Sequence, residues 1–162
     1  MEYYDTISDS YIELHGQEQY NKHILVRDTG IIGENDTVFD IGHGSGIICN
    51  VFPNNTIIGL DNSKSLLSMS TARTIRHDFN ILPLPIEDNS YDHTTCITAV
   101  HHHNSPGLLA REMKRIARKT VIISILKKSA KHDLIIDSLE EELGKPHIMS
   151  DAYHDIMMVW LI

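Results

Sequence analysis

The sequence predicts an α/β protein with a doubly wound, mostly parallel sheet that carries helices on both faces, in three layers. Two observations predict this fold. Residues 37–61 run as an apolar strand, a glycine-rich turn, a short helix and a second apolar strand. Beyond them, β-branched apolar runs alternate with amphipathic segments to the end of the chain, a pattern typical of strands joined by crossover helices.

The N-terminal segment is expected to be helical over residues 2–29, with Tyr11, Leu14, Ile24 and Leu25 as candidates for its apolar face. A loop over residues 30–36 then leads to the first strand. We expect residues 1–36 to form a helical lid.

The glycine-rich turn is the candidate ligand site. The first strand leads into Gly42-His43-Gly44-Ser45-Gly46, and the second strand ends on Asp61. Glycine lets the backbone approach a ligand and accepts positive φ, and the amides that open the following helix lack partners. A carboxylate at the tip of the second strand can accept both hydrogen bonds of a ribose diol. The unit indicates a nucleoside-bearing ligand; a turn without a ligand, or a nucleotide site of another kind, is the alternative.

The rest of the chain continues the alternation of strands and helices. The expected elements are a helix over 64–71 capped by Asn62 or Ser63, a third strand within 72–78, a fourth strand from Asp92 to His101, a helix over 106–118, a fifth strand over 120–126, a helix over 130–143, and closing strands over 147–149 and 155–162.

Composition narrows the class of protein. A chain of 162 residues suits one domain, which we expect over its whole length. The apolar stretches are strand-sized, so no membrane span is expected, and the acidic start does not resemble a signal peptide. Cys49 and Cys96 form no CxxC pair, so we expect free thiols and a cytoplasmic protein. A net charge of −8 argues against a stand-alone nucleic-acid binder.

Two blocks of the chain resemble a known family. In Asp40-x-Gly42-x-Gly44-x-Gly46, Ile47 stands where a dinucleotide fingerprint needs its third glycine. The pattern instead resembles the first motif of class I S-adenosyl-L-methionine (SAM)-dependent methyltransferases, with Asp61 as the acid of their second motif. Residues 84–102 resemble the LPF…ALHH stretch of the group that includes the ubiquinone and menaquinone biosynthesis methyltransferases.

The resemblance implies a Rossmann-like sheet of order 3-2-1-4-5-7-6 with the last strand antiparallel, and SAM as the cofactor. It also implies site residues by position. These are Asp40, Gly42, Gly44 and Gly46 around the methionine part, Asp61 at the ribose hydroxyls with Asn62 beside it, Asp78 and Phe79 at the adenine, Ala99 near the methyl group, and Tyr11 in a Tyr-rich segment over the pocket. Alternatively, Tyr11 packs its helix onto the sheet, and Asp78 is a turn residue.

Methyl transfer depends mainly on alignment and on exclusion of water. His101 and His102, at the expected end of the fourth strand, are candidates for a base or a substrate contact; packing is the alternative role. Adjacent histidines on a strand point to opposite faces, so no metal site is expected. No Pro-Pro-aromatic motif and no Pro-Cys follows this strand, which argues against transfer to a base amine and against the usual 5-methylcytosine route.

The expected function is methyl transfer from SAM to an unidentified, small-molecule acceptor. Residues 111–131 are strongly basic, with only Glu112 opposing the cations. This asymmetry keeps an RNA or protein acceptor as an alternative, although a solvated helix face also explains it and is the more ordinary explanation. A non-catalytic SAM-binding subunit of a larger complex is a third hypothesis. No membrane partner is expected, and the sequence leaves the oligomeric state open.

Overall fold

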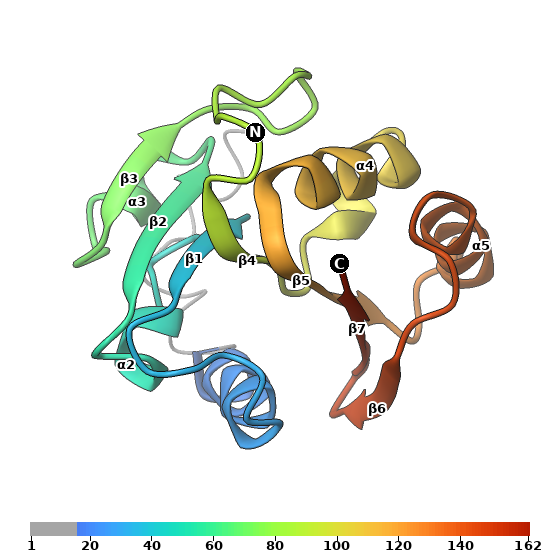
Figure 1. Ribbon diagram of the computed structural model, residues 1–162, viewed down its shortest axis with the longest axis horizontal. Helices are drawn as coiled ribbons and strands as arrows, with labels where there is room; N and C mark the ends of the chain where they lie inside the picture. Colours follow the sequence, from blue (N-terminus) through green and yellow to red (C-terminus); the bar gives the residue numbers. More distant parts are fainter. Residues whose placement is uncertain (1–15) are drawn as a thin grey trace.

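The computed structural model describes residues 16–162 and arranges them around a seven-stranded sheet (Figure 1). The strand order β3-β2-β1-β4-β5-β7-β6 confirms the expected order. β1 to β5 are parallel, and β7 runs antiparallel to both of its neighbours. The strands are β1 (Thr37–Ile41), β2 (Thr56–Asp61), β3 (Arg73–Arg76), β4 (Tyr91–Cys96), β5 (Ala117–Leu126), β6 (Ile148–Ala152) and β7 (Asp155–Leu161).

Helices cover both faces of the sheet, which makes three layers (Figure 1). They are residues 16–28, here called the N-terminal helix, α2 (Ile48–Val51), α3 (Lys64–Leu67), the 3-10 helix η1 (Val100–His102), α4 (Pro106–Ile116) and α5 (His132–Leu143). No helix among residues 16–162 is long and apolar enough to cross a membrane.

Side chains that alternate along the strands form two hydrophobic cores, one on each face of the sheet. In β5, Ile123 packs into the cluster that contains Leu109 of α4 and Ile135 of α5. Its neighbour Ile122 packs into the opposite cluster, which contains Val26 of the N-terminal helix. Because side chains alternate across a strand, one β-branched run supplies both faces of a buried sheet.

Several boundaries differ from the prediction by a few residues, and two of the differences change where the predicted side chains lie. β4 ends at Cys96 rather than His101, because Thr98 has a φ of +56° and interrupts the extended backbone. His101 and His102 therefore lie on η1, with ring centroids 4.1 Å apart, and not on opposite faces of a strand. At the second boundary, α4 ends at Ile116 and β5 begins at once with Ala117, so Arg118 belongs to the strand and not to the helix.

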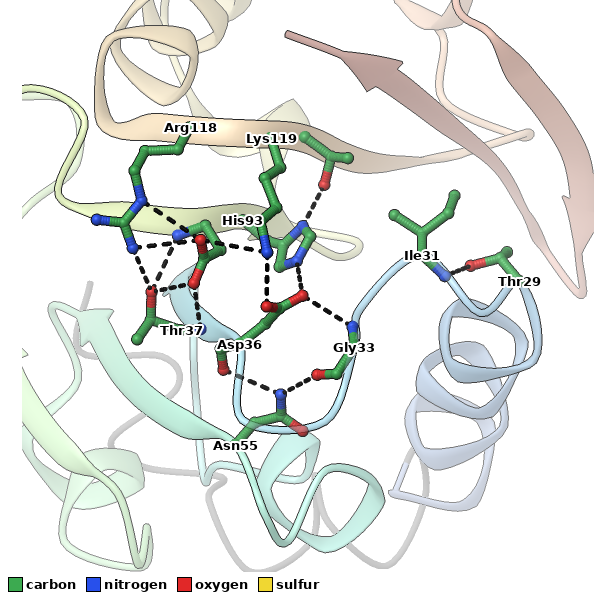
Figure 2. Close-up of polar contacts among 11 residues, drawn as sticks. Thr29, Ile31, Gly33, Asp36, Thr37, Asn55, His93, Arg118 and Lys119 are labelled. Atoms are coloured by element: carbon green, nitrogen blue, oxygen red, sulfur yellow. Dashed lines mark hydrogen bonds and ion pairs between the residues drawn. The ribbon is translucent and has the colours of Figure 1, made fainter.

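The amino ends of β1, β4 and β5 are joined by charged side chains (Figure 2). Asp36 lies 2.9 Å from His93 Nε2 and accepts a hydrogen bond from Lys119 Nζ at 2.6 Å. Asp92 accepts hydrogen bonds from the Thr37 amide and hydroxyl, both at 2.9 Å, and pairs with Arg118. These contacts connect the three strands at their amino ends, whereas the candidate site lies at the carboxyl ends.

The same contacts change the interpretation of the basic segment 111–131. Of its cations, Arg111 pairs with Glu142, Arg115 with Glu112 and Asp88, Arg118 with Asp92, Lys119 with Asp36, and Lys127 with Asp151. Most of the positive charge that the sequence concentrates there is therefore balanced by carboxylates from elsewhere in the fold.

Candidate active site

A cavity of about 330 Å³ opens at the carboxyl ends of β1, β2 and β4. This is the edge of an open α/β sheet at which ligands generally bind, and the volume suits one small ligand. Its walls are formed by Gln19, His23, Asp40, Gly42, His43, Gly44, Ser45, Ile47, Asp61, Asn62, Leu66, Asp78, Phe79, Asn80, Ile97, Thr98, Ala99 and His102.

Nine of the residues that the sequence nominated lie in these walls: Asp40, Gly42, Gly44, Asp61, Asn62, Asp78, Phe79, Ala99 and His102. Gly46 and His101 do not line the cavity. Tyr11 lies outside the described residues. The structure thus brings together side chains from the first motif, the second motif and the loops that follow β3 and β4.

The glycines of the turn serve different purposes. Gly44 has a φ of +56°, and within 4 Å of a Cβ added there the described part of the chain places only Leu66 Cδ1, at 4.0 Å. Because Leu66 also lines the cavity, that Cβ would project into ligand space. A Cβ on Gly42 would instead lie 2.4 Å from the Cβ of Ala99. Gly44 therefore leaves room for a ligand, whereas Gly42 leaves room for the chain that follows β4.

Asp61 is held in place by the backbone on both sides. Its Oδ2 accepts a hydrogen bond from the Gly44 amide and its Oδ1 one from the Ser63 amide, each at 2.9 Å. Ser63 in turn caps α3, with its hydroxyl accepting from the Leu66 amide. A carboxylate fixed in this way keeps further lone pairs for a ligand donor.

The loop after β3 supplies an acid and an aromatic ring. Asp78 Oδ1 accepts a hydrogen bond from the Asn80 amide at 3.0 Å, so this residue also shapes a turn. Phe79 is buried, and its ring stacks on His103 with a centroid distance of 6.0 Å. His103 is itself positioned by its Nδ1, which accepts from the Ser105 amide. The wall here combines an acceptor with an apolar surface.

His43, which the sequence gave no reason to single out, lies beneath the turn. Its Nδ1 is 2.8 Å from Asp40 Oδ2, and its Nε2 is 2.7 Å from Ser70 Oγ. Burial disfavours the charged imidazole, but the bond to Asp40, helped by Cys49, outweighs it and raises the pKa of His43 to about 9. The ring fills the space beside Gly59, where a Cβ would lie 2.2 Å from it.

Two further residues come from the N-terminal helix, Gln19 and His23. Burial lowers the pKa of His23 to about 4, so its imidazole is neutral at physiological pH. Its Nδ1 has no hydrogen-bond partner among residues 16–162, and a buried polar atom normally has one. A ligand bound in the cavity would supply that hydrogen-bond partner. No sequence motif marks either residue, because only the packing of the helix brings them here.

The two histidines proposed for chemistry differ in placement. His102 lines the cavity and is exposed, and partial burial lowers its pKa from the ordinary value. Burial, with the neighbouring His102, lowers the pKa of His101 to about 4, but His101 does not line the cavity. Among residues 16–162, no group of three His, Cys, Asp or Glu side chains is arranged to hold a metal ion.

The sequence matches known proteins over the same region. Residues 39–125 match the family model of the methyltransferase domain. Over 109 residues, 67% of the chain, the sequence is 30% identical to the tRNA (carboxymethyluridine(34)-5-O)-methyltransferase alkbh8 of Xenopus tropicalis. The chain spans only 16% of the length of that relative.

Solved structures share the fold. One is a chain from the complex between the Haloferax volcanii Trm112 methyltransferase activator and a protein proposed to be a methyltransferase, with a TM-score of 0.77, 16% identity, and coverage of 98% of this chain and 96% of that one. A second is a SAM-dependent methyltransferase of Thermotoga maritima, with a TM-score of 0.75, 13% identity, and 99% coverage of both chains.

Proposed function

This chain belongs to the class I methyltransferases that use SAM as methyl donor, and we propose that the cavity beside Gly44 and Asp61 is where the cofactor binds. The observation that carries the proposal is the pairing of an open space at Gly44 with a fixed carboxylate at Asp61. Backbone without a Cβ admits the ligand, and the carboxylate accepts from the ribose hydroxyls.

The residues present fit the parts of the cofactor. In the proposed arrangement, Asp61 with Asn62 holds the ribose, and Phe79 with Asp78 holds the adenine, because an apolar ring suits the base face and a carboxylate suits its amino group. Asp40, Gly42 and Gly44 support the methionine part, and Ala99 lies near the methyl group. When bound, SAM supplies an electrophilic methyl group on a sulfonium centre.

The protein's contribution to methyl transfer is alignment and exclusion of water. The N-terminal helix brings Gln19 and His23 to one wall of the cavity, which supports its expected role as part of a lid. His102 is the wall residue that can contact the acceptor. Because burial lowers its pKa, its neutral form can take a proton from an acceptor that carries one.

A small molecule is the acceptor that we propose first. The support is electrostatic: the chain carries a net charge of −8, and the cations of the basic segment are largely paired. An RNA backbone would meet little unbalanced positive charge there. We also place the protein in the cytoplasm, because its cysteines are free thiols.

A tRNA acceptor is the second candidate, and one observation favours it. The relative from Xenopus tropicalis, 30% identical over two thirds of the chain, is named as a tRNA methyltransferase. The Haloferax complex adds a further candidate, a small activator protein as partner, because its methyltransferase-like chain has the same fold as this one.

Two measurements test these proposals in turn. Calorimetric titration with SAM, and separately with NAD, tests the cofactor: saturable binding of SAM alone is expected, and binding of NAD alone would overturn the assignment.

Radiolabelled SAM is then offered with total tRNA or with a small-molecule extract, each with and without a Trm112-type activator. Label in the RNA fraction that ribonuclease releases would replace the small-molecule proposal with the tRNA one.

A further inference from the structure

Thr98 has an unusual backbone conformation at the wall of the cavity. It lies two residues beyond the end of β4, and its neighbours Ile97 and Ala99 line the cavity with it. Its φ is +56°, a region that L-residues avoid and that is least favourable for a β-branched side chain. Such a conformation persists only where surrounding contacts impose it, and it often occurs at functional sites.

Side chains from two other strands impose it. The Thr98 amide donates to Ser124 Oγ of β5 at 2.8 Å, and the Thr98 hydroxyl donates to Asp155 Oδ2 of β7 at 2.7 Å. Ser124 Oγ donates to the same Asp155 oxygen at 2.6 Å. Both the backbone and the side chain of Thr98 are therefore fixed through Asp155.

Asp155 is fully buried, and its charge is balanced by a buried lysine. Lys22 of the N-terminal helix is 2% exposed, and its Nζ lies 3.0 Å from Asp155 Oδ1 and 3.0 Å from Thr98 Oγ1. Glu18, one turn earlier in the helix, completes the set at 2.7 Å from the same Nζ. Neither Lys22 nor Asp155 lines the cavity.

We propose that Lys22 and Asp155 are positioning residues, whose buried ion pair holds Thr98, and with it the Ile97–Ala99 wall, in the conformation that binds the cofactor. Removing Lys22 alone would leave the buried Asp155 without this countercharge, whereas removing Asp155 alone would leave Lys22 paired with Glu18. The pair also links the N-terminal helix to β7 across the end of β4. Cofactor affinity then depends on two charges that do not touch the cofactor. The inference rests on the proposed function, because it assigns SAM to this cavity.

A double-mutant cycle tests the proposal. Lys22→Met/Asp155→Asn removes both charges together, which avoids leaving one unpaired. We expect SAM affinity to fall roughly tenfold, within the range by which substitutions along a coupled network alter binding. Glycine adopts positive φ without support, so in a Thr98→Gly background the same two substitutions should have little further effect on affinity. Equal losses in the two backgrounds would overturn the proposal.

Lys119→Met provides the matched control. Lys119 also pairs with an aspartate, Asp36, but at the opposite edge of the sheet (Figure 2). We expect it to leave SAM affinity unchanged. Circular dichroism melting establishes that each variant is folded at the temperature of the titration. A Lys22→Met/Asp155→Asn protein that is folded and binds SAM as tightly as the wild type would show that the pair serves stability alone.

Hydrogen exchange separates this inference from the proposed function. The Thr98 amide donates to Ser124 Oγ, so its exchange rate reports on this contact and can be measured with no cofactor added. We expect faster exchange over Ile97–Ala99 in Lys22→Met/Asp155→Asn than in Lys119→Met. If the wild-type protein fails to bind SAM, the proposed function is wrong, and the exchange rates still decide whether the ion pair holds this wall. Unchanged exchange would overturn the positioning role.

Discussion

Asp61 Oδ2 accepts a hydrogen bond from the backbone amide of Gly44 at 2.9 Å, so the acid that ends β2 is tied to the glycine turn that follows β1. The two elements that we propose hold the methionine part and the ribose of the cofactor are thus parts of one hydrogen-bonded unit. A substitution at Asp61 or in the glycine turn therefore also changes the contacts of the other element.

Asp61→Ala is expected to weaken SAM binding about 10- to 100-fold, since a hydrogen bond to a charged group contributes about 1.5–3 kcal/mol. Asp61→Asn should lose less, because an amide oxygen still accepts from Gly44. Calorimetric titration measures both. Asp151→Ala, which removes an exposed carboxylate paired with Lys127, is the control that should bind normally. Wild-type affinity in Asp61→Ala would remove the ribose contact from the proposal.

Gly44→Val is expected to abolish SAM binding, because the new side chain enters the cavity. Gly30→Val is a close control: Gly30 also has a positive φ, of +69°, and a Cβ there meets no atom of the described residues within 4 Å. Both variants carry the strain of a β-branched residue at positive φ, so both should melt at lower temperature. Only Gly44→Val should lose binding. Loss of binding in both variants would point to strain and not to crowding of the ligand.

Gly59→Ala is expected to destabilise the fold by about 1–3 kcal/mol, the usual cost of overpacking. The added methyl group would overlap the buried His43 ring, 2.2 Å away. The same change should cost much less in a His43→Ala background, where that ring is absent. Urea unfolding of the four proteins gives the coupling energy. Additive effects would mean that His43 is not what excludes a side chain at position 59.

Stability should fall as pH rises from about 6.5, the ordinary pKa of histidine, towards the folded-state value of about 9 for His43. In this window the folded protein keeps a proton that the unfolded chain releases, so the stabilising contribution is complete below it and is lost through it. The expected slope is on the order of 1 kcal/mol per pH unit. Urea unfolding of the wild type and of His43→Gln at several pH values checks it; parallel curves would contradict the ion pair with Asp40.

The local motifs predicted the parts of the site that short stretches of chain build. Each of these motifs lies within a few consecutive residues: a glycine turn, an acid at a strand end, and an acid–aromatic pair after the third strand. They place Gly44, Asp61 and Phe79 in one cavity because the carboxyl ends of parallel strands share one edge of the sheet.

The remaining features depend on contacts between distant residues. Lys22 meets Thr98 and Asp155, which lie 76 and 133 positions away in the chain, and no spacing rule connects them. The end of β4 was misplaced for the same reason: a run of β-branched and apolar residues predicts continued strand, but the contacts of Thr98 impose positive φ. The cations of the basic segment are likewise visible within a short stretch of sequence, whereas most of the carboxylates that balance them come from other elements.

The antiparallel direction of β7 has a practical consequence. Because β7 returns along β5, the amide of Ile162 donates to the Lys119 carbonyl at 2.8 Å, close to the amino end of β5 and across the sheet from the cavity. An affinity tag fused after Ile162 would therefore attach the protein to a sensor chip or a resin at the end of the sheet that lies away from the cavity. Immobilised molecules would present the mouth of the cavity to the flowing solution, so that acceptor libraries can be screened without the support blocking entry.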